Sequence, residues 1–174
     1  METITIQIFQ DDVYKEVAKA TDYTGSKLID GDEGARDRIL AADEDLAELG
    51  RFWEESVLAA NESLKEMLVT GGTAYITPTL NPITPQGVTS VTPTLGEKGY
   101  RAEIGVSKSF DKALTASVQS TLRSFFIASI IGQWFKFANK GEAQDYLIQA
   151  SEMMIAAERL LYSRRRPTRP NKQK

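Results

Sequence analysis

Four carboxylates lie close together in the first third of the chain: Asp43, Glu44, Asp45 and Glu48. Their oxygens could bind a divalent cation, or supply the acid and base of a carboxylate-dependent hydrolase. Because consecutive residues of a helix point in different directions, at most two of the four share a face. We interpret the cluster as a solvated acidic face, with weak divalent-cation binding as the alternative.

The chain of 174 residues contains no cysteine and no histidine. Disulfides, thiolate zinc sites, thiol catalysis and imidazole ligands are therefore excluded. A catalyst built from this sequence would have to rely on carboxylates, Lys, Ser or Tyr. We expect a protein that is not an enzyme, with no catalytic residues, no cofactor and no metal site.

Two further patterns have a chemical and a structural interpretation. Thr24-Gly25-Ser26-Lys27 resembles the end of a phosphate-binding loop, but the upstream glycine is missing, and we expect an ordinary turn within a loop at 21–34. Five aromatic residues could stack on nucleic-acid bases, but their positions on helical apolar stripes favour core packing: Phe52, Trp53, Phe125, Phe126 and Trp134.

The charge of the chain is unevenly distributed. Residues 1–70 carry 17 Asp and Glu against 7 Lys and Arg, whereas the last 11 residues carry only positive charges. These are Arg164, Arg165, Arg166, Arg169, Lys172 and Lys174. Three roles fit such a tail: a disordered solubilising end, an arm ordered by the acidic surface of a partner or neighbouring copy, or phosphate contacts with nucleic acid.

The elements that position these residues can be predicted from periodicity. Residues 3–9 alternate in the manner of a strand, and Asp11 and Asp12 can cap a short helix that ends near Ala20. From 36 to 69, apolar residues recur every three or four positions, which predicts one long amphipathic helix or a hairpin hinged at Gly50. An unbroken helix of that length would extend past its own core and pack on a neighbouring subunit.

Residues 70–98 contain four of the six prolines and many threonines. We expect a projecting hairpin with edge strands at 74–80 and 88–95, or else a disordered loop. A further strand at 100–107 would pair with this insertion or with residues 3–9. Unpaired backbone groups here favour contacts with another chain, and the predicted interface residues, with the basic tail, are Ile76, Thr77, Pro78, Leu80, Val91, Pro93 and Leu95.

Two more helices are predicted, from Ser109 or Asp111 onward and from about 142 to 162, and they should form an antiparallel hairpin. The first is apolar on several faces from Phe125, so we place it at the centre of the core. The expected fold class is mainly α: an antiparallel helical bundle with a projecting Pro/Thr-rich β-hairpin or small β insertion. We expect one domain over 1–163, its β-prone insertion at 70–107, and an extended basic arm at 164–174.

The first ten residues contain no basic region and no long apolar run, and the strongly apolar stretch at 125–131 is too short to span a bilayer. We therefore expect neither a signal peptide nor a membrane anchor.

The order of these pieces resembles the head–tail connector, or adaptor, proteins of tailed bacteriophages and prophages. The resemblance lies in the acidic helical part with Asp43-Glu44-Asp45-Leu46 before Phe52-Trp53, the β-prone insertion at 73–107, and terminal helices that end in Leu160-Leu161-Tyr162-Ser163-Arg164-Arg165-Arg166-Pro167. The insertion is longer than in the simplest members, so no site residue is carried over.

The resemblance implies a structural protein of the virion neck or tail, made in the host cytoplasm. It would form a homo-oligomeric ring, commonly of twelve subunits, that contacts the portal protein and tail or neck proteins. DNA would pass through the lumen without sequence-specific binding. The alternative is a small regulatory or nucleic-acid-binding module that uses the basic tail, and a carboxylate-dependent hydrolase is a third hypothesis.

Overall fold

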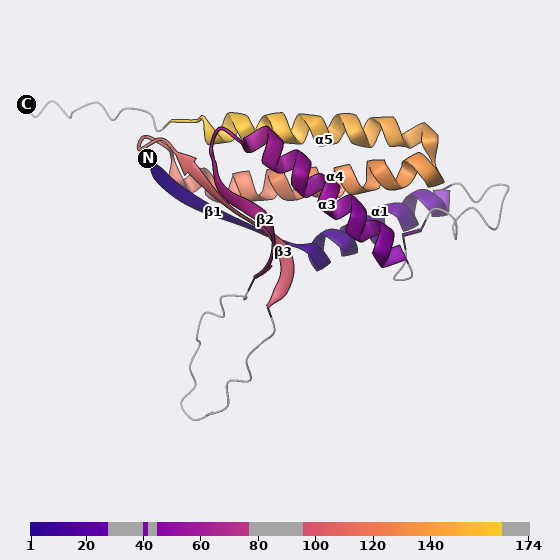
Figure 1. Ribbon diagram of the computed structural model, residues 1–174. Coiled ribbons are helices and arrows are strands. Elements are labelled where there is room, and N and C mark those ends of the chain that lie inside the picture. The colour runs from indigo at the N-terminus through magenta and orange to yellow at the C-terminus, as the bar shows by residue number, and fades with distance from the viewer. Residues whose placement is uncertain (28–39, 42–44, 77–95, 165–174) are drawn as a thin grey trace, which may run out of the picture.

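A three-stranded sheet and four long helices make up the part of the chain that the computed structural model describes, residues 1–27, 40–41, 45–76 and 96–164 (Figure 1). The elements in chain order are β1 (Glu2–Phe9), α1 (Gln10–Lys27), α3 (Leu46–Leu64), β2 (Leu68–Ile76), β3 (Glu97–Val106), a 3₁₀ turn (Lys112–Leu114), α4 (Thr115–Ala138) and α5 (Lys140–Leu161).

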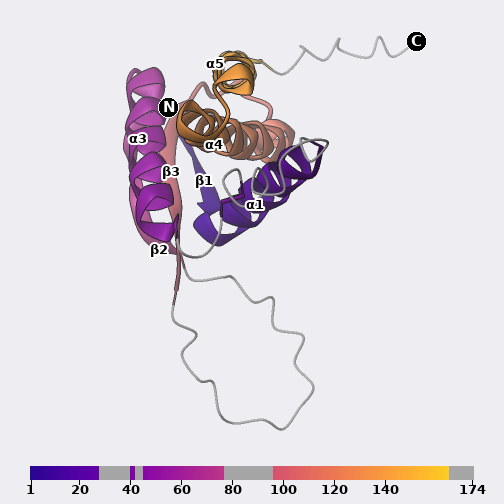
Figure 2. The same cartoon turned by 90° about the vertical axis from the view of Figure 1, so that its right-hand side faces the viewer.

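The sheet is antiparallel, with the strand order β1-β3-β2. β3 lies in the middle because it pairs on one side with β1, where Ile6 is opposite Ala102, and on the other with β2, where Thr73 is opposite Tyr100. From the sequence we expected this strand to pair with either the insertion or residues 3–9, and in the structure it pairs with both β1 and β2. Alternate residues of β1 and β3 are buried on one face of the sheet, and the helices lie against that face (Figure 2).

The predicted fold class, a mainly α bundle, is wrong: the chain has a mixed α/β fold. The prediction treated the strand at 3–9 and the 70–107 insertion as appendages to a helical core. In the structure they form one sheet, and Ile6, Ile8 and Tyr100 are among the most deeply buried side chains. Sequence periodicity does not report pairing between segments so far apart, so the contribution of the sheet to the core was missed.

The first helix is longer than predicted. α1 continues to Lys27, so Thr24-Gly25-Ser26-Lys27 is helical and the expected turn is wrong at these residues. The hydroxyl of Thr21 donates to the carbonyl of Val17 at 3.0 Å and accepts from the amide of Ala41 at 3.1 Å. Small polar residues thus continue the buried face of the helix. The rest of the predicted loop, 28–34, lies outside the described residues.

The predicted helix over 36–69 is confirmed only between Leu46 and Leu64, where α3 lies; residues 36–39 and 42–44 lie outside the described residues. Residues 40–41 are not helical, α3 begins at Leu46 and ends at Leu64, and the chain enters β2 at Leu68. α3 passes Gly50 without a break, so the alternative hinge is wrong as well. The amide of Gly105 in β3 donates to the carbonyl of Met67 at 2.7 Å. This pairing requires extended chain where apolar spacing alone favoured more helix.

The hairpin of the last two helices is confirmed. α4 and α5 lie antiparallel along their length, and Asn139, which is extended at φ −151°, is the only residue between them (Figure 1). Residues from Phe125 to Phe135 are buried on several sides, as predicted. The segment Lys112–Ala138 is long and apolar enough to cross a membrane, because it contains an 18-residue stretch with a mean hydropathy of 1.2. Its central place between the sheet, α1, α3 and α5 accounts for that composition (Figure 2).

Aromatic packing joins the two layers. Trp53 of α3 stacks on Phe126 of α4 with ring centroids 4.8 Å apart, and Tyr100 of β3 lies 5.1 Å from the same ring. The indole N–H of Trp53 donates to the hydroxyl of Thr73 at 3.1 Å. Core packing is thus confirmed for Phe52, Trp53, Phe125 and Phe126, which are buried, while Trp134 is partly buried against the core.

The close packing of α4 on α5 can be tested by substitution of Gly132. A Cβ at this position would lie 2.8 Å from Cδ2 and 2.9 Å from Cγ of Leu147. We expect Gly132→Ala to lower the free energy of unfolding by about 1–2 kcal/mol, because the overpacking cost exceeds the gain in helix propensity. Gly50→Ala in α3 is the matched control: no atom lies within 4 Å of its Cβ, so stability should rise by roughly 0.5–1 kcal/mol. Urea unfolding measures both, and equal effects would contradict this account.

Because Tyr100 is buried, we expect the free energy of unfolding to fall at high pH. Burial raises the pKa of its phenol from 10.0 to about 12, so the folded chain favours the protonated form. The stabilisation is complete below pH 10 and is lost as the pH rises from 10 toward 12, at up to about 1.4 kcal/mol per pH unit. Tyr100→Phe should flatten this part of the stability profile, and Tyr75→Phe, at a residue that is 74% exposed, should not. Thermal melts between pH 9 and 11.5 measure the difference.

Candidate assembly surfaces

Two of the predicted interface residues fall in the described chain. Ile76 ends β2 opposite Glu97 and is only 2% exposed, and its side chain lies close to Gly99 of β3. Arg164 is exposed and forms an isolated backbone bridge with Phe110, which places the start of the C-terminal arm beside the segment between β3 and α4. The others lie outside the described residues: Thr77, Pro78, Leu80, Val91, Pro93, Leu95, Arg165, Arg166, Arg169 and Lys172.

The acidic cluster is described only in part, because Asp43 and Glu44 lie outside the described residues. Glu48, in the first turn of α3, forms an exposed ion pair with Arg51 at 2.9 Å. Within the described residues, no three His, Cys, Asp or Glu side chains are grouped in a way that could hold a metal ion. Weak cation binding at the cluster therefore gains no support from the described part.

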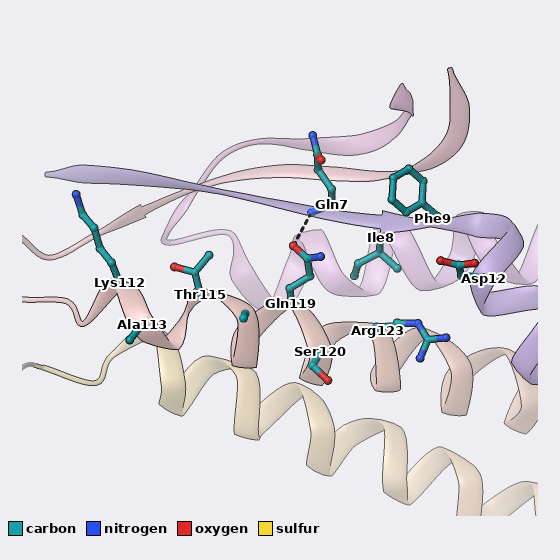
Figure 3. Close-up of a pocket in the computed structure, with 11 residues that line it drawn as sticks. Gln7, Ile8, Phe9, Asp12, Lys112, Ala113, Thr115, Gln119, Ser120 and Arg123 are labelled. Atoms are coloured by element: carbon teal, nitrogen blue, oxygen red, sulfur yellow. Dashed lines mark hydrogen bonds between the residues drawn. The ribbon is translucent and has the colours of Figure 1, made fainter. Parts of the chain in front are cut away.

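A groove of about 590 Å³ runs between β1 and α4 (Figure 3). One side is lined by Gln7, Ile8, Phe9 and Asp12, the other by seven residues between Lys112 and Arg123. The ammonium of Lys112 lies 3.1 Å from a carboxylate oxygen of Glu2, and the side chain of Gln119 contacts Gln7. The 3₁₀ turn and the first part of α4 therefore follow β1 along most of its length. Asp12 and Arg123 mark the far end of the groove.

The edge of β1 that faces this groove is not paired with another strand in the described chain. The amide of Gln7 points away from β3 and donates to Oε1 of Gln119 at 3.4 Å. Because the N–H and C=O groups of alternate residues in an antiparallel strand point to the same side, those of Thr3, Thr5 and Phe9 also face outward. Asp12 is the only carboxylate among the lining residues, so the groove offers no acid and base pair.

A second surface is an apolar stripe along α5, formed by Ile148, Ile155 and Tyr162, the residue that directly follows the helix. Their side chains are 47%, 47% and 61% exposed, and they follow one another at seven-residue spacing. Seven residues are close to two helical turns, so the three lie along one face. Ala143, Ala150 and Ala157 are buried on the other side of α5, which packs on α4. α5 is therefore apolar on two opposite faces.

Comparison with known proteins does not assign these surfaces. No family model matches this chain, and neither a curated protein nor a solved structure is significantly similar to it. Sequence reasoning missed both surfaces. The stripe was detectable as a second apolar period in the last helix, whereas the groove depends on the strand order of the sheet, and no local signal encodes that order.

The contact between Gln119 and the open edge of β1 can be tested directly. Gln119→Leu removes the acceptor for the Gln7 amide, and a hydrogen bond of about 1 kcal/mol corresponds to about five-fold faster amide exchange. Gln119→Glu keeps an acceptor oxygen and should leave the exchange rate near that of the original chain. Hydrogen exchange of the Gln7 amide followed by NMR separates the two. Equal rates in both variants would show that the side chain does not protect this edge.

Proposed function

We propose that this chain is a structural adaptor, or connector, of a bacteriophage virion, which forms a homo-oligomeric ring between the portal and the tail. The observation that carries the proposal is the apolar stripe of α5. Single exposed apolar residues are ordinary on any protein surface. Three of them at seven-residue spacing line one side of the helix as a continuous apolar stripe, so this face is suited to contact with a neighbouring subunit.

The position of α5 supports this role. It forms the outer layer of the helical side and packs chiefly on α4 (Figure 2). The exposure of Ile148 and Ile155 shows that the stripe faces away from that contact. A closed ring arises from contacts between two different surfaces of neighbouring copies. In this proposal, the stripe of one subunit therefore meets a different part of the next. A ring of twelve, and contacts with portal, tail or neck proteins, are what the resemblance adds.

The charge of the chain suits a channel for DNA. The full sequence has a net charge of −3, and α3 exposes four carboxylates, at Glu48, Glu54, Glu55 and Glu62. Glu48 pairs with Arg51 and Glu62 pairs with Lys65. Negative charge repels phosphate and so disfavours retention of DNA at any sequence. In the proposed ring, DNA passes through the lumen without sequence-specific binding. The same repulsion disfavours the nucleic-acid-binding alternative.

Substitution of the stripe tests the ring. We expect the purified chain, alone or with its portal protein, to form closed rings visible by mass photometry and cryo-electron microscopy. Ile148→Glu together with Ile155→Glu should reduce the ring population at least ten-fold, because charge would replace apolar contact at the interface.

The control for this experiment is Leu58→Glu on α3, a single apolar residue that is 67% exposed. It should leave the ring intact, and circular dichroism should show folded chain in both variants. Rings that persist in the double variant would contradict the role of the stripe. A chain that stays monomeric at every concentration, with and without portal, would contradict the proposed function.

A further inference from the structure

The groove between β1 and α4 has the form of a site for an added strand. We propose that it accepts residues Gln86–Thr92 of a second copy of this chain, which pair with the open edge of β1 as a fourth strand. This inference rests on the proposed function, because it requires copies of the chain to meet. Strand addition to a sheet edge derives its affinity from backbone hydrogen bonds, and β1 offers those of Thr3, Thr5 and Phe9.

An added single strand suits the groove better than a second sheet. The opposite edge of the sheet, β2, is packed against α3, where Trp53 donates to Thr73 and Asn61 donates to the carbonyl of Gly71. Neighbouring strands lie about 4.8 Å apart, whereas packed helices need 8–10 Å. If β2 of another copy joined β1 as a parallel strand, the helices of both copies would lie on the same face of the extended sheet, and the added α3 would meet α4, which already lines the groove. An extended segment without a helix beneath it avoids that collision.

Among the residues between β2 and β3, 86–92 is the stretch suited to pairing. The segment 77–95 contains four prolines, and 86–92 is its longest run without one. Because proline has no N–H group, only this run can pair continuously with a neighbouring strand. Its sequence, Gln-Gly-Val-Thr-Ser-Val-Thr, is rich in β-branched residues, which favour extended structure.

Charge favours this segment over the basic tail. The groove is lined by Lys112, Arg123 and one acid, Asp12, and Lys112 is paired with Glu2, so the groove offers little negative charge to the five positive charges of the tail beyond Arg164. Residues 77–95 carry no charged side chain, so their approach meets no repulsion. The donor segment and the acceptor groove are also different surfaces of the chain. Pairing between copies is therefore heterologous, the kind of contact that closes a ring.

Amide exchange in the full chain tests the pairing residue by residue. In the assembled protein, the amides of Thr5 and Phe9 should be protected, and Ser90→Pro should accelerate their exchange at least ten-fold. The amides of Ile6 and Ile8 face β3 and should stay slow in both proteins. Thr79→Pro is the matched control, because it places a proline in the same segment but outside the pairing run.

A mixture of two variants shows whether the strand comes from another copy. The Ser90→Pro chain, labelled with ¹⁵N, keeps an open groove. The unlabelled partner carries Ala116→Trp, which fills the groove from an exposed position of α4 and leaves residues 86–92 intact. Mixing should restore protection of Thr5 and Phe9 in the labelled chain.

Ser117→Trp is the control for Ala116→Trp. It alters an exposed residue of α4 that does not line the groove, so the protection of Thr5 in the chain that carries it should be unchanged.

Two outcomes would overturn the proposal. The first is unchanged amide exchange of Thr5 and Phe9 in the Ser90→Pro chain. The second is no recovery of protection in the mixture, which would mean that the added strand comes from the same chain or that no strand is added. Mass photometry of the same samples separates this result from the adaptor role. Rings without protection at Thr5 would contradict the strand and leave the adaptor proposal standing. Recovery in the mixture without closed rings would support the strand and contradict the ring.

Discussion

The pairing of β3 with β1 is the interaction on which the rest of the structure depends. It joins residues 2–9 to residues 99–106 and makes β3 the central strand, with β2 on its other side. The face that results holds Ile6, Ala102 and Tyr100 against the helices. Space at this pairing is tight: a Cβ at Gly99 would lie 2.4 Å from the carbonyl oxygen of Ile8. A residue with a side chain would separate the strands here, so glycine is required.

The helices are held to this sheet by a core that combines apolar and polar contacts. Phe126 of α4 lies between Trp53 and Tyr100, and therefore touches both a helix and the sheet. Beside it, the buried hydroxyls of Ser56 and Ser129 are 2.8 Å apart and link α3 to α4. Gln133 donates to Ser129, while its own Oε1 lacks a hydrogen-bond partner within the described chain. A paired polar group in the core costs less than an unpaired one and limits how α3 can slide along α4.

The two candidate assembly surfaces follow from this arrangement. α4 is covered by the sheet, α1, α3 and α5. Since α5 packs chiefly on α4, its opposite face remains available to a neighbour. Because β1 is an edge strand with α4 beneath it, its backbone faces a groove and not open solvent. One surface offers apolar side chains and the other backbone hydrogen bonds. Contacts of such different chemistry can be changed separately by substitution, which makes the roles of the two surfaces distinguishable.

The sequence by itself determined those helices and strands whose buried residues recur at the regular spacing of that element. The alternation of Ile4, Ile6 and Ile8 predicted β1, and the spacing in 115–161 predicted α4, α5 and their hairpin. Tertiary structure decided the remainder. Leu68–Ile76 is a strand because β3 pairs with it, although two glycines interrupt its pattern, and α1 reaches Lys27 because its neighbours bury Thr21 and Gly25. The groove beside β1 exists only once the strand order is set. The apolar period of a helix or strand shows which of its faces is apolar, but distant segments of the chain decide what covers that face.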